Sequence, residues 1–274
     1  MDQRAKAKRF LELHTSGRLL VLPNAWDAGS ARIFEHAGFQ ALGSTSAGVA
    51  LSLGRPDGER VSRAEMLEAV RRIAGAVAIP VTADLEAGYG PTVGDAVETA
   101  RGAIAAGAVG MNFEDSTSDD RLVDAAAQVE RIRAIKKLAE AEKIAFVLNA
   151  RTDVFLLQIG EPAGRFDEAV RRANAYRQAG ADCLFVPGVT DADTIGRLVR
   201  AIKGPLNVLT GRGTPPTAEL ERLGVARVSI GGGPMRATLT LTRRIAEELR
   251  DHGTYTGFTE NVLPLRDFNR LFDR

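Results

Sequence analysis

The sequence predicts a single α/β domain folded as a (β/α)8 barrel of the TIM type. Eight short apolar runs recur along the chain, and each is followed by a segment with helical periodicity. The runs are apolar throughout rather than alternating, which is typical of parallel strands buried on both faces. No GxGxxG fingerprint follows the first run and no P-loop motif occurs, so an open nucleotide-binding sheet is disfavoured.

The expected elements alternate regularly along the chain. A helix over residues 3–15 precedes the barrel. The predicted strands cover residues 19–22, 41–43, 79–83, 108–113, 144–148, 182–186, 206–209 and 226–230. The helices that follow them cover residues 28–37, 62–77, 93–106, 124–142, 166–179, 191–202, 217–223 and 234–250, and a last short helix covers 265–271.

Cap and stop residues justify the helix limits. Asp27 can accept a hydrogen bond from the first turn of its helix, and Ser62 with Glu65 matches the capping-box pattern. Pro234 stands in a first turn, where its missing N–H has no cost. Glycine ends several helices, as at Gly38, Gly107 and Gly180.

Length, charge and cysteine content restrict the class of protein. The 274 residues suit one barrel domain over residues 1–274. The net charge of +1 gives no overall attraction to nucleic acid or to an anionic membrane surface. Cys183 is the only cysteine and lies in an apolar run, so we expect it in the core of a cytoplasmic protein. No signal peptide and no apolar run of membrane-spanning length is found, so no membrane partner is expected.

Polar and charged side chains gather directly after the second to fifth predicted strands. In a (β/α)8 barrel these C-terminal strand ends meet around one mouth, where active sites lie. The second strand delivers a hydroxyl loop and a later acid, the third and fourth deliver acids, and the fifth delivers an arginine: Ser44, Thr45, Ser46 and Asp57; Asp84 and Glu86; Glu114; and Arg151. The pattern predicts a group of carboxylates facing one cation.

Asp84 and Glu86 follow the third strand in the sequence PVTADLEAGYG. If the extended backbone continues past the strand end, residues two apart point to the same side. With Glu114 from the next strand, these carboxylates suit Mg²⁺, directly or through its retained waters. Arg151 is placed to hold a substrate carboxylate, and residues 44–46 to hold another oxygen. Mg²⁺ chelated by a 2-oxo acid would polarise the carbonyl and stabilise an enolate.

Structural explanations stay open for several of these residues. Arg151 with Asp153 could form an ion pair at a strand end, and Glu114 with Asp115 could cap the segment that follows. The glycines at 231–233 suit either phosphate binding by backbone amides or a tight turn. The histidines lie away from the strand ends, which argues against a histidine triad or a zinc site: His14, His36 and His252.

Four segments, in this order and spacing, resemble the isocitrate lyase / phosphoenolpyruvate mutase superfamily. They are NAWDAGSARIFEHAGFQALGSTS, ADLEAGYG, NFEDS and NARTD, within a resemblance that runs from Leu22 to about Arg250. It implies a (β/α)8 barrel whose eighth helix is exchanged between neighbouring subunits, and therefore a homodimer or homotetramer. It also implies Mg²⁺, with Mn²⁺ as a substitute, and a small 2-oxo acid or its enolate as the ligand.

The same resemblance assigns roles at the barrel mouth. Superfamily members share one direct metal ligand, acids that hold the waters of the metal, a substrate-binding loop and a substrate-binding arginine. Carried over by position, these are Asp84 for the ligand; Asp57, Glu86 and Glu114 for the waters; Thr45, Ser46 and Ala47 for the loop; and Arg151 for the arginine. Ser44 precedes the loop and joins the expected substrate-binding residues, and the expected catalytic residues are Asp57, Glu114 and Arg151.

The chain departs from the superfamily pattern where the leaving group is selected. The second acid of the DxDxGYG pattern is Glu86, one methylene longer. The lyases carry a cysteine in a KKCG-type loop, and the mutases and phosphonopyruvate hydrolases carry lysine and asparagine there, whereas residues 116–124 read STSDDRLVD. Gly43 replaces a tryptophan common in the mutases, and Pro187 lies where a histidine is found. What replaces the cysteine stays open, with Arg121 or an acid of the loop as candidates.

Three functions are compatible with these residues. The first is a Mg²⁺-dependent lyase that makes or breaks a C–C bond, or decarboxylates, next to a pyruvate-like enolate of a small 2-oxo or 2-hydroxy acid. The second is a phosphonomutase or C–P hydrolase acting on a phosphonopyruvate-like substrate. The third is a protein that binds a 2-oxo acid with little turnover. The lyase is the preferred hypothesis, because the missing gate residues count against the second.

Overall fold

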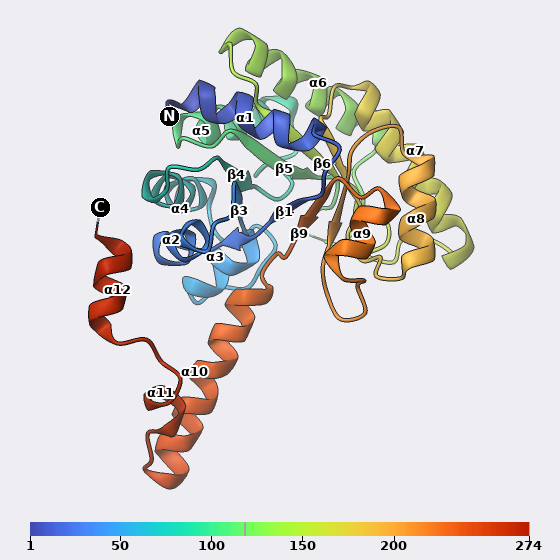
Figure 1. The fold of residues 1–274 in the computed structure, drawn as a ribbon. Helices are drawn as coiled ribbons and strands as arrows, with labels where there is room; N and C mark the ends of the chain where they lie inside the picture. Colours follow the sequence, from blue (N-terminus) through green and yellow to red (C-terminus); the bar gives the residue numbers. More distant parts are fainter. Residues whose placement is uncertain (118, 274) are drawn as a thin grey trace.

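The computed structural model describes residues 1–117 and 119–273, and within these residues the predicted barrel is present (Figure 1). Nine strand segments in this part of the chain pair in parallel, in the order β1-β9-β8-β7-β6-β5-β4-β3-β2. They are β1 (Leu20–Leu22), β2 (Asn24–Ala25), β3 (Leu42–Ser44), β4 (Val81–Asp84), β5 (Gly110–Glu114), β6 (Val147–Arg151), β7 (Cys183–Phe185), β8 (Leu206–Leu209) and β9 (Arg227–Ser229).

The barrel closes at Pro23, which is the only residue between β1 and β2. β1 pairs with β9, placing Leu20 opposite Arg227, and β2 pairs with β3, placing Asn24 opposite Gly43. A proline has no N–H to give to a neighbouring strand, so the break falls where the first strand changes partners. The two segments act as one strand, and the predicted (β/α)8 fold class is confirmed.

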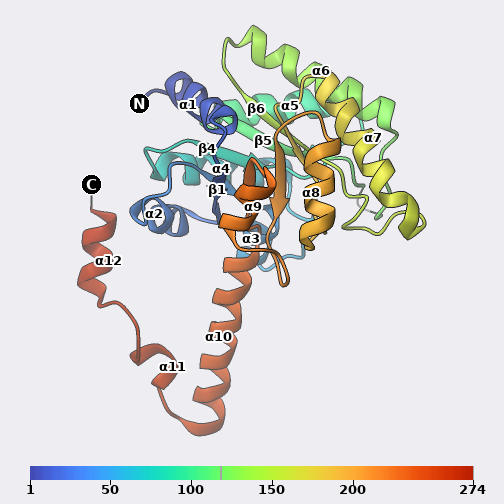
Figure 2. The same cartoon turned by 45° about the vertical axis from the view of Figure 1, so that its right-hand side comes forward.

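Helices surround this barrel, and the C-terminal helices extend away from it (Figures 1 and 2). They are α1 (Gln3–Thr15), α2 (Ala28–His36), α3 (Ser46–Ser52), α4 (Arg63–Ala76), α5 (Val93–Ala105), α6 (Ala125–Ala141), η1 (Pro162–Gly164), α7 (Arg165–Gln178), α8 (Ala192–Ala201), α9 (Thr217–Leu223), α10 (Gly233–His252), α11 (Thr256–Thr259) and α12 (Leu265–Phe272). The expected cap at Asp27 and the expected capping box at Ser62 are confirmed. The segment after the second predicted strand was expected to be a loop, but it begins α3, capped by the Thr45 hydroxyl.

α1 lies against the N-terminal end of the barrel. Phe10 and His14 are its buried aromatic residues, and their rings meet edge to face at 4.6 Å. A Cβ at Gly110, the first residue of β5, would lie 3.2 Å from the Phe10 ring and 2.5 Å from the Val147 carbonyl oxygen. Gly110 therefore lets the β5 backbone approach β6 closely while Phe10 closes the barrel below it.

α10 leaves the barrel and projects away from it, with α11 against its far end (Figures 1 and 2). Met235 is its only buried residue among those described. The chain returns through α12, which contacts α2, where Arg32 Nη1 donates to the Phe272 carbonyl at 3.1 Å. Among the described residues, none of the helices combines the length and apolar character needed to cross a membrane.

Candidate active site

Asp84, the last residue of β4, is buried and held by four hydrogen bonds. Its Oδ2 accepts from the amide and from the hydroxyl of Ser46, both at 2.9 Å, and its Oδ1 accepts from Asn112 Nδ2 at 3.1 Å. The Asp84 amide donates to Ser44 Oγ at 2.8 Å. Ser44 and Ser46 therefore position this carboxylate from the neighbouring strand and from the first turn of α3.

The hydroxyl loop is thus the start of a helix. Thr45 Oγ1 accepts from the Gly48 amide at 3.3 Å, and Ser46 donates to Asp84. The Ala47 amide has no acceptor within the part of the chain that the structure describes. Of the predicted substrate-binding residues, Ala47 therefore offers a free backbone donor, whereas Ser44 and Ser46 already contact Asp84.

Glu86 lies in a turn, which corrects the expectation of an extended backbone after Asp84. β4 ends at Asp84, and Glu86 has a left-handed backbone with φ 49°. Its carboxylate accepts from the Glu59 amide and, at 3.0 Å, from the Tyr89 hydroxyl. Its own carbonyl accepts from the Glu114 amide at 3.1 Å, so the two acidic segments lie side by side.

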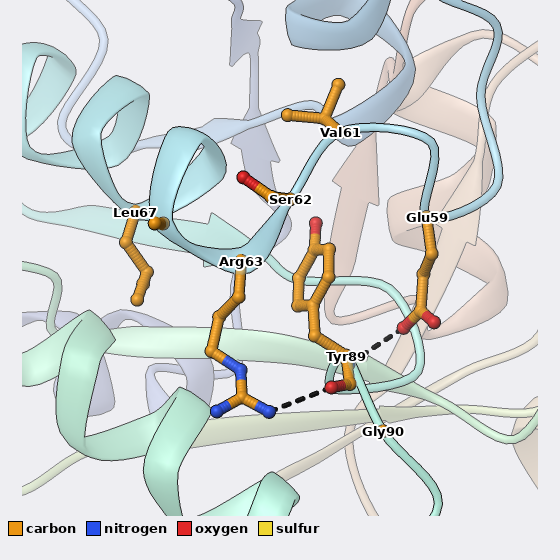
Figure 3. Close-up of a pocket in the computed structure, with 8 residues that line it drawn as sticks. Glu59, Val61, Ser62, Arg63, Leu67, Tyr89 and Gly90 are labelled. Carbon is orange, nitrogen blue, oxygen red and sulfur yellow. Dashed lines mark hydrogen bonds between the residues drawn. The ribbon is translucent and has the colours of Figure 1, made fainter.

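Glu59 and Tyr89 form a latch over this turn. Glu59 Oε1 accepts from the Tyr89 amide at 2.8 Å, and Arg63 Nη2 donates to the Tyr89 carbonyl at 2.8 Å (Figure 3). A pocket of about 590 Å³ lies between the turn and α4, and Glu59, Arg63, Leu67 and Tyr89 are among its lining residues (Figure 3). Sequence reasoning missed Glu59 and Tyr89, although the Gly-Tyr-Gly turn signalled that the backbone bends here.

Glu114, Arg151 and Asp153 form a second cluster. Arg151 Nη1 lies 2.6 Å from Glu114 Oε2, and Arg151 makes a bidentate contact with Asp153 at 2.6 and 2.9 Å. The Ser116 hydroxyl donates to Glu114 Oε1 at 2.9 Å. The ion pair between Arg151 and Asp153, left open above, is present. Some of the N–H groups of Arg151 are therefore already hydrogen-bonded before any substrate binds.

Asp115 points away from this cluster, into the helical layer. Its Oδ2 accepts from the Tyr176 hydroxyl at 2.6 Å and from Arg172 Nη1 at 3.2 Å, and its Oδ1 accepts from the Asp153 amide at 3.0 Å. The capping role left open for Glu114 and Asp115 is not observed, since α6 is capped by Asp124, the residue predicted to begin that helix. Asp115 instead ties the ends of β5 and β6 to α7.

Carboxylates outnumber cations at the barrel mouth. Burial raises the pKa of Glu86 to about 7, and the Asp57 and Asp84 carboxylates add to the rise. Burial also raises the pKa of Glu114, against the opposing effect of Arg151. Asp57, on the loop before α4, has its pKa raised by partial loss of solvation and then by the Asp84 carboxylate. Each carboxylate is thus destabilised by the others, and a cation among them would relieve the repulsion.

These residues fit a cation held mainly by Asp84. Asp84 Oδ2 already accepts two hydrogen bonds and Oδ1 accepts one, which leaves a lone pair free on Oδ1. Among the described residues, no three His, Cys, Asp or Glu side chains converge as a ready set of ligands. Mg²⁺ usually keeps several of its waters. The arrangement therefore suits one direct ligand, with waters reaching Glu86 and Glu114.

The sequence analysis gave no role to two interior amides. Asn112 lies two residues before Glu114 and donates to Asp84, and Asn149 lies two residues before Arg151 and donates to Asn112 Oδ1 at 2.7 Å. Because side chains two apart on a strand share a face, this spacing was the available signal.

Comparisons with known proteins place these residues in a family context. The phosphoenolpyruvate phosphomutase family profile matches residues 10–250. An oxaloacetate decarboxylase of Rhodopseudomonas palustris (strain HaA2) is 32% identical over 262 residues, which cover 91% of this chain and 86% of that protein.

Solved structures agree with that match. A proposed lyase/mutase from Burkholderia cenocepacia J2315 superposes with a TM-score of 0.93 at 43% identity, covering 99% of this chain and 97% of that chain. A 2,3-dimethylmalate lyase, described as a PEP mutase/isocitrate lyase superfamily member, superposes with a TM-score of 0.86 at 27% identity, covering 97% of this chain and 94% of that chain.

Proposed function

The chain belongs to the phosphoenolpyruvate phosphomutase family, and we propose that within it the protein is a Mg²⁺-dependent lyase for a small 2-oxo or 2-hydroxy acid. Relatives of this family are named lyases, decarboxylases and mutases, and the chain is an enzyme of this group. The observation that carries the proposal is the group of carboxylates around Asp84 facing the Arg151 guanidinium.

Asp84 is the proposed metal ligand, with Glu86, Glu114 and Asp57 as acids that hold the waters of the metal. Mn²⁺ would bind the same oxygen donors. When bound, the metal would supply Lewis-acid polarisation of the substrate oxo group. Ser46 donates twice to Asp84 Oδ2, so the orientation of the Asp84 carboxylate is set before binding.

Substrate binding is proposed for Thr45, Ser46, Ala47 and Arg151, with Ser44 supporting them from behind. The free Ala47 amide can donate to a carboxylate or to a developing enolate oxygen. Arg151 holds Glu114 and Asp153 in the structure and retains further N–H donors for a substrate carboxylate. In this proposal the Arg151 guanidinium and the Ala47 amide bind an anionic substrate. Asp57 and Glu114 are the acids proposed to act on it at the same barrel mouth.

The decarboxylase and lyase relatives favour C–C chemistry over phosphoryl transfer. The glycine run at 231–233 does not strengthen the phosphonomutase alternative, because the amides of Ile230 and Gly231 both donate to Asn24 Oδ1 at 2.9 Å. Those amides support the tight turn into α10. The phosphonomutase and C–P hydrolase remain the second candidate on family membership alone.

The decisive experiment is a Mg²⁺-dependent screen of small di- and tricarboxylates and phosphonopyruvate, with pyruvate and phosphate as the measured products. We expect pyruvate release that EDTA abolishes and Asp84→Ala removes. Asp182→Ala is the matched control, because Asp182 is a part-buried acid that binds Lys136 at the opposite end of a strand. Full activity and metal binding in Asp84→Ala would refute the site. Phosphate as the only product would favour the mutase or hydrolase.

The assembly proposed is a homodimer or homotetramer of single-domain subunits, each spanning residues 1–274, in which α10 packs on a neighbour. Leu239, Leu241 and Leu249 are exposed on this projecting helix at 39%, 50% and 41%. Sedimentation of wild type and Leu241→Glu tests the assembly, and a monomeric wild type would contradict it. A cytoplasmic location stays a prediction, which cell fractionation checks.

A further inference from the structure

The interior of this barrel is polar. Barrels of this fold are usually filled with branched apolar side chains. Here Arg227 on β9 reaches Asn112 on β5, at 3.2 Å from Nη2 to Oδ1. β9 and β5 are not neighbours in the sheet, so this contact crosses the barrel interior. Ser229 and Asn207 extend the same network, with Oγ to Nδ2 at 3.1 Å.

Arg227 is fully buried and forms no direct ion pair within the described part of the chain. It is 0% exposed, and no salt bridge to it is found in residues 1–117 and 119–273. Its Nε donates to Ser229 Oγ at 3.3 Å, its Nη2 donates to Asn112, and its Nη1 has no acceptor in the same residues. Burial lowers the pKa of Arg227 to about 10, so the guanidinium keeps its charge at neutral pH.

A buried arginine of this kind lowers the stability of the fold, so stability does not explain its presence. A buried charge without a counter-ion is unfavourable, and apolar side chains of similar volume replace buried ions with little loss or with a gain in stability. The Nη1 atom adds the cost of an unsatisfied donor. The position of Arg227 therefore calls for an explanation other than packing.

The explanation lies in the direction of the hydrogen bonds at Asn112. Arg227 can only donate, and it donates to Asn112 Oδ1, which also accepts from Asn149 Nδ2 at 2.7 Å. With its oxygen occupied by donors, Asn112 must turn Nδ2 toward Asp84, where it donates to Oδ1 at 3.1 Å. Asn149 could reverse its own amide, since its Oδ1 has no donor among the described residues. The guanidinium cannot reverse, so it decides the orientation of Asn112.

We propose that Arg227 is a positioning residue for the metal site, acting through Asn112 to hold Asp84 in the orientation of a metal ligand. The inference rests on the proposed function, in which Asp84 binds Mg²⁺. Arg227 itself does not touch the metal or the substrate. It acts on Asp84 through the side-chain amide of Asn112, which accepts from Arg227 and donates to Asp84.

The test measures Mn²⁺ affinity by electron paramagnetic resonance and Mg²⁺ affinity by calorimetry, with no substrate present. Arg227→Met is expected to weaken metal binding by about 10- to 100-fold, the range for outer partners of metal ligands. Arg227→Lys keeps a charge and donors, and we expect it to recover part of the affinity. The melting temperature of Arg227→Met is expected to equal or exceed that of wild type, which a purely structural role would not produce.

Asn112→Ser tests the same path without removing the arginine. It is expected to weaken Mn²⁺ binding as Arg227→Met does, and the double variant is expected to be no weaker than either single one. Thr82→Val is the matched control, because Thr82 is buried on β4 and its Oγ1 has no partner among the described residues. It should leave the metal affinity unchanged.

The outcomes separate this inference from the function on which it rests. Wild-type affinity in Arg227→Met, or an equal loss in Thr82→Val, would overturn the positioning role and leave the metal site intact. Should Arg227→Met not fold, wild-type affinity in Asn112→Ser overturns the role in the same way. Wild-type affinity in Asp84→Asn would overturn the metal site itself, and the positioning role with it.

Discussion

The Tyr89 hydroxyl donates to Glu86 Oε1 at 3.0 Å, and both residues have left-handed backbones, with φ 57° for Tyr89 and 49° for Glu86. Such a conformation is uncommon for residues other than glycine. Two of them within one turn show that the loop after β4 is shaped to bring the Glu86 carboxylate under the Glu59 amide. The Glu86 carboxylate is thereby held in a fixed place.

Metal-free protein is expected to lose stability as the pH rises from about 4.5 to about 7. The unfolded chain releases the Glu86 proton near pH 4.5, whereas the folded protein holds it until about pH 7. The native state therefore binds more protons than the unfolded chain in this pH range. The free energy of unfolding is highest below about pH 4.5 and falls by about 3 kcal/mol as the pH rises to about 7. Urea unfolding in EDTA measures this, and Glu86→Gln should flatten the slope. A stability that rises over the window in both proteins would contradict the prediction.

Tyr89→Phe should raise the pKa of Glu86 further, because the lost hydrogen bond favours the carboxylate. Metal binding that needs this carboxylate should then reach half its maximum at a higher pH. Mn²⁺ affinity measured from pH 5 to 9 provides the readout. Tyr255→Phe is the control, since Tyr255 is 58% exposed on the C-terminal segment. Identical pH profiles for wild type and Tyr89→Phe would argue against the latch.

Arg151→Met is expected to destabilise the fold by about 3–5 kcal/mol, because it leaves Glu114 and Asp153 buried without a cation. Their side chains are 14% and 1% exposed. Because burial raises the pKa of Glu114, the loss should be smaller at pH 5 than at pH 8. Urea unfolding at the two pH values tests this. Arg133→Met, which removes an exposed pair with Glu130, should cost under about 1 kcal/mol. An equal cost for both variants would exclude a special role for Arg151.

Mg²⁺ should stabilise the protein by about 2.7 kcal/mol at a concentration of 100 times its Kd, because it binds the folded state alone. The shift should be absent in Asp84→Asn and present in Asp182→Asn. Thermal unfolding with and without Mg²⁺ gives the comparison. An unchanged shift in Asp84→Asn would place the metal elsewhere.

Tyr176→Phe should cost about 1–3 kcal/mol, since it removes a 2.6 Å donor from the buried Asp115 carboxylate. Metal affinity should not change, because Asp115 faces the helical layer and not the mouth. Urea unfolding and Mn²⁺ titration measure the two effects. A loss of metal affinity without a loss of stability would show that Asp115 belongs to the site.

Much of the fold followed from the sequence because each strand is a short apolar run ended by a polar residue. Asp84, Glu114 and Arg151 stand at such ends, so their convergence required only the barrel topology. The start of α3 was missed because serine and glycine are poor helix formers, and its helix depends on the Thr45 cap and on contacts around it.

Other features could not be predicted because they depend on the local backbone conformation or on the direction in which a side chain points. Glu86 needed a left-handed turn, which the adjacent glycines permit but do not require. Arg227 stands in the sequence ARVS, where nothing shows whether it points into the barrel or toward the helices. Only the assembled sheet reveals that it crosses the interior to Asn112.

The pairing of Leu20 on β1 with Arg227 on β9 determines when the barrel can close during synthesis of the chain. The first strand waits for a partner more than 200 residues away, so a ribosome must release almost the whole barrel before the ring can close. Until then β1 is an unpaired edge open to association with other chains. The same event delivers the guanidinium that orients Asn112 beneath Asp84. A nascent chain therefore acquires the support of its proposed metal ligand only when the barrel closes, and a chain stalled earlier carries the acids without that support.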